Sequence, residues 1–225
     1  MLLENMNKLN NLLIEPYRLF RKLRFLIEWV MSLFPHFRYF KTTKNAEYPI
    51  TLPIWYRQKF LGKNGSAYWP MHPSSMISYA KNVLIGKGVV PGYSTGCYIH
   101  AVNKIYIDDY TFIAPNVGIM SGNHDQTDLR LQTKNEPVRI GKYCWIGMNT
   151  VILPEVVLGD FTIVGAGAIV TKSFEKGYCI IAGNPARIIK QLDREKCLRF
   201  DEDVTHIGYV PINKFEQFRI KNLNV

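Results

Sequence analysis

The chain has 225 residues, of which 47% are hydrophobic and 20% charged, enough to bury one sizeable core and typical of a single folded domain. The 28 Lys and Arg residues exceed the 18 Asp and Glu residues and give a formal charge of +10, which favours an anionic partner without naming one. No CxxC pair is present, so we expect neither a zinc knuckle nor a dithiol redox site, and we interpret the cysteines as reduced thiols of a cytoplasmic protein. They are Cys97, Cys144, Cys179 and Cys197.

Residues 1–48 are predicted to form two short amphipathic helices, because apolar residues recur at helical spacing before Pro16 and again before Pro35. The two apolar runs are Leu2, Met6, Leu9 and Leu13, then Leu19, Leu23, Leu26 or Ile27, Val30 and Phe34. The second helix begins with the basic residues Arg18, Arg21, Lys22 and Arg24. These basic residues suit binding of the helix to anionic lipid headgroups. The alternative, which we favour, is that the helix packs on the protein itself or on a neighbouring subunit.

Two further segments flank the central part of the chain. Residues 49–76 are expected to be an ordered but irregular connector, because four prolines are spread among aromatic residues. Within it, Trp69, His72 and Ser74 are candidates for ligand contacts, although aromatic packing over the end of a core is the interpretation we favour. Residues 193–225 are predicted to be a C-terminal helix and tail packed on the central domain.

Residues 77–192 carry an internal period of six. The aliphatic positions of the repeat are Ile107, Ile113 and Ile119, then Ile140, Ile146, Ile152, Leu158, Val164 and Val170, with Ile85 as an outlying copy. One aliphatic in every six residues fits a triangular coil with three short strands per turn, so that each coil takes about 18 residues. Glycine follows several of the aliphatics, and we expect it to supply the positive φ of a sharp corner.

Several motifs in this region resemble the hexapeptide-repeat acyltransferases, most closely the maltose and galactoside O-acetyltransferases and the serine and polysaccharide O-acetyltransferases. They are Ile146-Gly147, Val164-Gly165-Ala166-Gly167, Val170-Thr171-Lys172 and Ile181-Ala182-Gly183-Asn184-Pro185-Ala186-Arg187. The resemblance implies a mainly β fold, a left-handed parallel β-helix, to which the sequence pattern adds the N-terminal helical segment and a short C-terminal helix and tail. It also implies a homotrimer that uses acetyl-CoA as acyl donor. His100 and His124 are 24 residues apart and no HxxxxH pair is present, so we expect no metal to be required.

The period fails at residues 121–137, which we predict to be a projecting catalytic loop. It contains His124 in an Asn-His-Asp setting, and the resemblance implies that this histidine is the general base. An imidazole can take the proton of an attacking hydroxyl and return it to the leaving thiolate. Asn123, Asp125 and Asp128 are candidates to orient the ring or hold the acceptor, with a solvated loop carboxylate as the alternative for each aspartate.

Four residues match cofactor positions of the family. The resemblance implies that Ala166 meets the pantetheine arm and that Lys172 and Arg187 lie near the phosphates and adenine. It also implies that Trp145 borders the cofactor channel; packing of Trp145 against a neighbouring subunit is the alternative role. Two departures stand out. Met148 occupies a position where the family often has serine, and residues 91–100 lack the asparagine that holds the sugar.

We therefore predict an acyl-CoA-dependent O-acetyltransferase that acts on a hydroxyl of a sugar or of a polysaccharide or glycan precursor. N-acetylation of a nucleotide-linked amino sugar or a small antibiotic is the alternative, and a non-catalytic scaffold is a third interpretation. The basic residues are scattered among acidic ones, which argues against nucleic acid. Peripheral association with the inner face of a membrane, through the N-terminal helices, is a further hypothesis.

Overall fold

The computed structural model describes residues 19–225. The chain divides into two compact units, Met1–Pro53 and Ile54–Val225. The first of the two predicted N-terminal helices, with its apolar run at 2–13, lies outside the described residues. Within residues 19–225, no helix combines the length and the apolar character needed to cross a membrane.

The first unit contains the second predicted helix, which covers residues 19–32 and is confirmed. The helix ends before Pro35, which opens the 3-10 turn η1 (Pro35–Phe37) and is followed by the short helix α2 (Tyr39–Thr42). Proline lacks a backbone N–H and clashes with the preceding turn, so a helix stops here.

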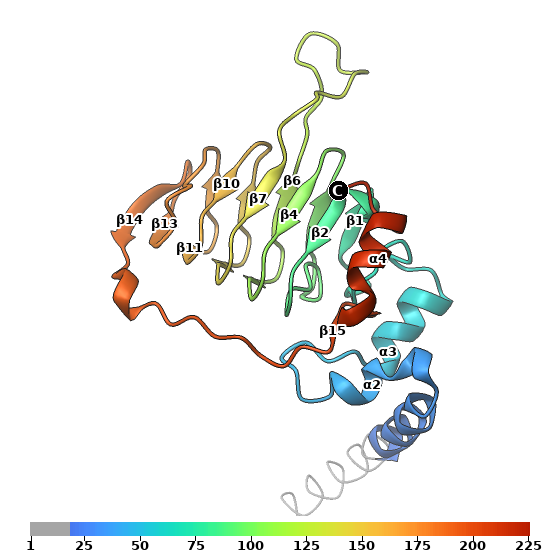
Figure 1. Ribbon diagram of the computed structural model, residues 1–225. Helices are drawn as coiled ribbons and strands as arrows, with labels where there is room; N and C mark the ends of the chain where they lie inside the picture. The colour runs from blue at the N-terminus through green and yellow to red at the C-terminus, as the bar shows by residue number, and fades with distance from the viewer. Residues whose placement is uncertain (1–18) are drawn as a thin grey trace, which may run out of the picture. The chain divides into compact units, whose positions relative to one another are not determined.

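The second unit is built around a prism of three parallel sheets (Figure 1). Sheet A contains β1 (Met76–Ser78), β3 (Tyr98–His100), β6 (Gly118–Met120), β9 (Val151–Ile152) and β12 (Ile169–Val170). Sheet B contains β2 (Val83–Ile85), β4 (Ile105–Ile107), β7 (Val138–Ile140) and β10 (Val157–Leu158). Sheet C contains β5 (Phe112–Ile113), β8 (Trp145–Ile146), β11 (Thr162–Val164) and β13 (Cys179–Ala182), closed by the antiparallel β14 (Arg187–Gln191). The chain passes from sheet B to C to A and back to B, so the prism has a B–C, a C–A and an A–B corner.

The register confirms the six-residue period. In sheet B, Ile140 pairs with Ile107 on one side and Leu158 on the other, so one full coil from Ile140 to Leu158 takes the 18 residues predicted. The repeat aliphatics of all three sheets form a continuous core that is almost fully buried, namely Ile85, Ile107, Ile140, Leu158, Ile113, Ile146, Val164, Ile119, Ile152 and Val170. The parallel β-helix therefore follows directly from the spacing of these residues.

The corner glycines serve a different purpose from the one predicted. Gly141 and Gly147 do not have positive φ; instead, a Cβ at either would lie 2.7 Å or less from backbone atoms of the next coil. The positive φ occurs two residues later, at Tyr143 and Asn149. The prediction was therefore wrong about the cause: these glycines allow successive coils to approach closely, and a tyrosine or asparagine adopts the left-handed conformation.

An aromatic ladder runs along the B–C corner, made of residues that share this left-handed conformation. The rings of Tyr110, Tyr143, Phe161 and Tyr178 follow one another with centroids 5.6, 4.8 and 5.1 Å apart. Offset aromatic contacts at these distances stabilise the stack beyond simple burial. The ladder thus reinforces one edge of the prism.

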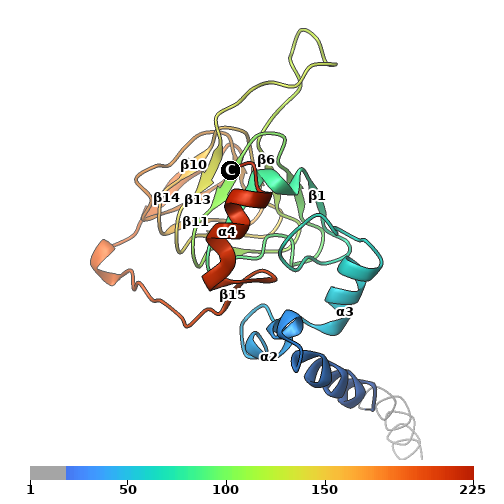
Figure 2. The same ribbon diagram turned by 45° about the vertical axis from the view of Figure 1, so that its right-hand side comes forward.

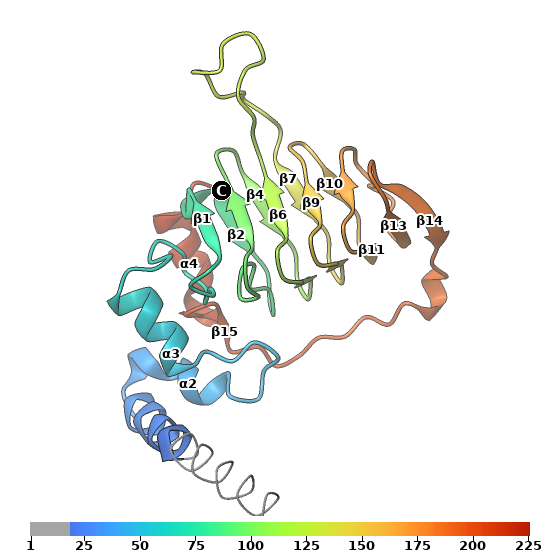
Figure 3. The same cartoon turned by 180° about the vertical axis from the view of Figure 1, so that it is seen from behind.

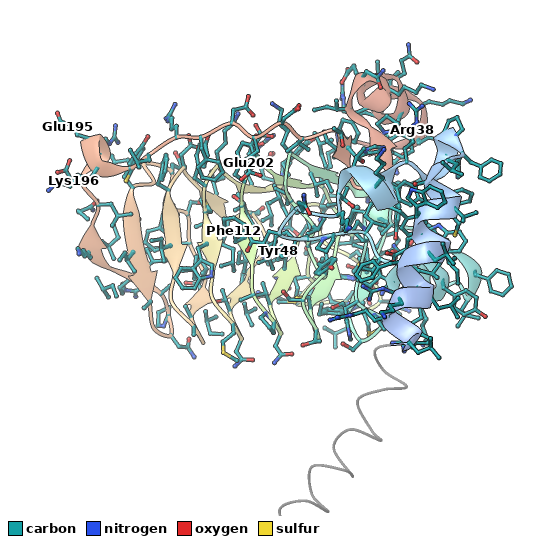
Figure 4. The ribbon with its side chains drawn as sticks, turned by 90° about the horizontal axis from the view of Figure 1, so that it is seen from below. Arg38, Tyr48, Phe112, Glu195, Lys196 and Glu202 are labelled. Carbon is teal, nitrogen blue, oxygen red and sulfur yellow. The ribbon has the colours of Figure 1, made fainter. Side chains whose placement is uncertain are left out.

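The C-terminal segment returns along this ladder (Figure 3). After the turn η4 (Arg194–Lys196), an extended strap at 197–205 follows the prism from Glu195 and Lys196 to Glu202 (Figure 4). Tyr143 donates its hydroxyl to the Phe200 carbonyl at 2.7 Å. The chain ends in β15 (His206–Ile207), β16 (Val210–Pro211) and the helix α4 (Ile212–Asn222), so the predicted C-terminal helix is present and a long strap precedes it.

The connector contains α3 (Leu52–Trp55) and the π-helical turn η2 (Tyr56–Phe60), and from η2 to β1 the chain forms only irregular turns. The 3-10 turn η3 (Ala80–Asn82) follows β1. Trp69 is fully buried and donates its indole N–H to the Pro91 carbonyl at 2.7 Å. His72 Nδ1 lies 2.7 Å from the Ser74 hydroxyl. Trp69 is therefore part of the core at the end of the prism.

Candidate active site at two corners of the prism

The loop at 121–137 leaves the prism at the A–B corner, between the end of β6 and the start of β7, and projects away from it (Figures 1 and 2). Asn103 holds its two stems together, because its side-chain amide donates to the carbonyls of Ser121 at 2.8 Å and Thr133 at 3.2 Å. Gly122 packs so tightly here that a Cβ would lie 2.9 Å from Asn103 Nδ2. The base of the loop is thus anchored to the rigid coil below it.

Backbone hydrogen bonds order the outer part of the loop as well. Thr133 N–H donates to the Asn123 carbonyl at 2.8 Å, and Asp125 N–H donates to the Leu131 carbonyl at 3.0 Å. His124 lies between these two bonds and faces Gln132 in an antiparallel bridge. A histidine in a short, hydrogen-bonded ribbon has a defined backbone position, which a free surface loop would not provide.

The His124 imidazole is held by a backbone carbonyl. Its Nδ1 lies 2.6 Å from the Leu129 oxygen. A carbonyl oxygen accepts hydrogen bonds and cannot donate, so Nδ1 carries a proton, and in the neutral ring Nε2 presents the lone pair. The side chain is exposed, and it can therefore accept a proton from a group that approaches the loop.

The two aspartates of the loop stabilise turns. Asp125 accepts from the N–H groups of Thr127 at 2.8 Å and Asp128 at 3.0 Å and from the Thr127 hydroxyl, and these bonds, the hydroxyl first, lower the pKa of its carboxyl. Asp128 binds the Arg130 guanidinium at 2.8 and 2.7 Å, which lowers the pKa of Asp128. Their carboxylates are engaged in the turns around His124, and the Leu129 carbonyl takes the place beside the ring.

A second group of predicted residues lies at the C–A corner and on the outer face of sheet C. Ala166 is exposed in the turn between β11 and β12, where Gly167 N–H donates to the Met148 carbonyl of the coil before at 2.8 Å. Arg187 begins β14 and pairs with Ala182, at the same corner. Trp145 is 55% exposed on β8, so one aromatic ring lies on the outer face of the sheet whose strands end at this corner.

Lys172 belongs to the other corner. It follows β12 and is exposed, with its Nζ 5.9 Å from the centre of the Phe174 ring. Because the strands of sheet A run parallel, they all begin at the C–A corner and end at the A–B corner. His124 and Lys172 therefore share one edge of sheet A, and Ala166 and Arg187 share the opposite edge.

Two contributors were missed by the sequence reasoning. The Leu129 carbonyl has no side-chain signature, and only the Asp-x-Thr and Asp-x-Arg turns around it indicated that the loop folds on itself. Asn103 lies in the preceding coil, 18 residues before Ser121, and no local motif marks it. Both contacts involve a backbone carbonyl as acceptor, which spacing alone does not reveal.

Comparisons with known proteins agree with this fold. Residues 137–172 match the family described as bacterial transferase hexapeptide (six repeats). The chain is 33% identical over 149 residues to galactoside O-acetyltransferase of Escherichia coli K12, covering 61% of this chain and 68% of that protein. This chain belongs to the hexapeptide-repeat acyltransferases.

Solved structures extend the match between this hexapeptide-repeat acyltransferase and its relatives. A maltose O-acetyltransferase from Clostridium difficile 630 superposes with a TM-score of 0.53 at 26% identity, covering 71% of this chain and 89% of that one. A galactoside acetyltransferase in complex with coenzyme A gives a TM-score of 0.51 at 31% identity, covering 62% and 68%. The left-handed parallel β-helix predicted from the resemblance is confirmed.

Proposed function

We propose that this acetyltransferase moves an acetyl group from acetyl-CoA to a hydroxyl of a sugar or glycan precursor, with His124 as general base. One observation carries the proposal. The Leu129 carbonyl accepts from Nδ1 at 2.6 Å and so leaves the lone pair of Nε2 on the exposed side of a hydrogen-bonded loop. The names of the relatives, a galactoside and a maltose O-acetyltransferase, support a sugar hydroxyl as acceptor.

The chemistry requires one base and no acyl-enzyme. As the hydroxyl oxygen attacks the thioester carbonyl carbon, Nε2 takes the hydroxyl proton. The carbon–sulfur bond then breaks, the electron pair leaves on sulfur, and the imidazolium returns the proton to give the free thiol. The Leu129 carbonyl keeps the neutral ring in the productive tautomer and accepts a stronger hydrogen bond once the ring is charged.

The residues of the C–A corner fit an extended, phosphorylated donor. Ala166 is exposed and adds no side chain beyond Cβ, so a pantetheine arm can pass close to the backbone there. Arg187 lies at the same corner and Lys172 at the other, and both are exposed cations suited to phosphate. Trp145 offers an exposed apolar face on sheet C.

The separation of these groups supports a homotrimer. Within one chain, His124 and Ala166 lie at opposite edges of sheet A. Threefold packing would set the A–B corner of one subunit against the C–A corner of the next, because each prism presents both. The strap covers the remaining B–C corner, so it does not obstruct such packing.

The test begins without an acceptor. We expect acetyl-CoA to bind the wild-type protein at one site per subunit in calorimetry, and Arg187→Ala to weaken binding by roughly tenfold, the usual scale for a charged phosphate contact. Thiol release with a panel of sugars and amino sugars then identifies the acceptor. His124→Ala should lose about 10²- to 10⁴-fold in kcat while it binds acetyl-CoA normally; unchanged turnover in this variant would rule out the assignment of the base.

A further inference from the structure

The helix at 19–32 packs on its own unit with its polar side. Arg24, Glu28 and Ser32 form one row at a spacing of four residues, and Glu28 and Ser32 are only 8% and 7% exposed. Glu28 Oε1 accepts the Leu52 N–H at 2.7 Å and lies 3.5 Å from Arg24 Nε. This is the reverse of the usual arrangement, in which the apolar stripe of a surface helix faces the protein.

The apolar stripe of this helix faces outward instead. Five members recur every three or four residues, and the sixth follows the last of these just past the helix end; all are between 44% and 70% exposed. They are Leu19, Leu23, Leu26, Val30, Leu33 and Phe34. Soluble proteins rarely expose a continuous apolar surface of this kind unless it binds a partner. We call these six residues the apolar stripe.

The first unit, to which the stripe belongs, is strongly basic. The exposed charged residues of 19–53 are Arg21, Lys22, Arg38, Lys41, Lys44 and Glu47. Lys44 Nζ lies 5.4 Å from the centre of the Phe25 ring. Since cations outnumber the one exposed carboxylate, a second copy of this surface would bring like charges together, whereas an anionic partner would be attracted.

Aromatic residues complete the pattern. Trp29 is 59% exposed and Phe20 is 63% exposed, both on the same helix. Tryptophan at the border between apolar and basic residues is typical of the headgroup level of a bilayer, and a helix with these faces lies in the plane of the membrane surface. The stripe fits the acyl chains and the lysines and arginines fit lipid phosphates.

We propose that the apolar stripe docks on the surface of an anionic lipid bilayer and tethers the acyltransferase unit there. The stripe belongs to the first unit and the acetyl-transfer residues to the second, so the inference does not depend on that proposal. It replaces packing of the apolar face on its own unit as the interpretation of this helix, because the side that packs on the first unit is the polar one.

The test is flotation of the full-length protein with phosphatidylcholine vesicles that contain about a third phosphatidylglycerol. We expect the wild type to float with these vesicles and to bind pure phosphatidylcholine at least tenfold more weakly, because each nearby basic residue adds to the attraction. High salt should weaken binding in the same direction. Leu23→Gln/Val30→Gln should lose at least tenfold in partition, and Arg21→Gln/Lys22→Gln roughly tenfold.

The matched control is Leu198→Gln/Ile220→Gln, which removes two apolar side chains of the second unit that are more exposed than Leu23 and Val30 and should float like the wild type. Trp29 should shift its fluorescence to shorter wavelength on binding, and Trp29→Phe should lose that shift. Wild-type protein that stays with the soluble fraction overturns the proposal.

Two other outcomes overturn it. If Leu23→Gln/Val30→Gln floats as well as the wild type, the stripe is not the contact. If that variant instead lowers the oligomeric state in sedimentation, or lowers the Tm while the control does not, the stripe is covered by protein. Acetyl-CoA binding by calorimetry is measured on the same samples, so a failure of lipid docking is distinguished from a failure of the acetyl-transfer proposal.

Discussion

Replacing Gly147 by alanine tests whether the corner glycines exist to let successive coils approach. A Cβ at this position would lie 2.6 Å from the Val164 oxygen, 2.7 Å from the Ala166 nitrogen and 3.0 Å from the Gly165 carbonyl carbon. All three are backbone atoms of the next coil, which cannot rotate away as a side chain can. The Gly147 N–H also donates to the Val164 carbonyl at 2.9 Å, so relief of the clash would stretch this hydrogen bond.

The expected loss follows from these contacts. Overpacking a rigid site costs about 1–3 kcal/mol, and alanine recovers about 0.4–1 kcal/mol by restricting the unfolded chain. The net loss in free energy of unfolding is about 0–2.6 kcal/mol, near 1.3 kcal/mol at the centre of this range. A loss of that central size lowers the Tm of a chain of this length by about 3–5 °C. Because Ala166 N is one of the atoms pushed, the affinity for acetyl-CoA should fall as well.

Gly118→Ala is the matched control, because a Cβ there would be in ordinary van der Waals contact with the Val151 side chain at 3.8 Å and the Thr150 carbonyl oxygen at 4.0 Å. We expect no loss of stability, or a gain of about 0.4–1 kcal/mol. Gly167→Ala separates backbone strain from crowding, because Gly167 has a φ of +71° and no atom within 4 Å of the added Cβ. The variant should lose about 1 kcal/mol in free energy of unfolding from the strained φ alone. Equal Tm values for Gly147→Ala and Gly118→Ala in differential scanning calorimetry would refute the close-approach argument.

Three further predictions concern the loop, the strap and the thiols. Asn103→Ala removes the two hydrogen bonds that join the stems of the loop, each of which contributes about 1 kcal/mol to the stability of the loop. Amide hydrogen exchange at 121–137 should therefore accelerate, and kcat should fall while the affinity for acetyl-CoA is retained. In the strap, the carboxylate of Asp201 contacts the Tyr110 hydroxyl and Lys87, and these contacts lower the pKa of Asp201. Docking of the strap on the prism should therefore hold above the unfolded pKa of about 3.9 and weaken as the pH falls through the lower pKa of the folded state. Limited proteolysis should detect this acid dependence in the wild type, and Asp201→Asn should abolish it. Cys197 is partly exposed whereas the other three cysteines are buried, so Cys197→Ser should remove the fast phase of maleimide labelling followed by mass spectrometry.

The β-helix and the position of its loop could be predicted from the sequence because both depend on spacing. One aliphatic in every six residues can be buried continuously only if each coil repeats after 18 residues, and Ile107, Ile140 and Leu158 are indeed neighbours in one sheet. The loop at 121–137 was visible as the place where that period stops. A repeat that must place the same residue type in the same environment leaves its mark in the chain itself.

Only the tertiary structure decided how these parts work. The close approach at Gly147, the hydrogen bond from His124 to Leu129 and the anchoring of the loop by Asn103 depend on backbone atoms that no residue type announces. The helix at 19–32 shows the same limit: helical spacing predicted its amphipathic character, but not which face packs on the protein. That choice was made by the partly buried hydrogen bond that Glu28 accepts from the Leu52 N–H, a contact 24 residues away that turns the polar row inward and leaves the apolar stripe exposed.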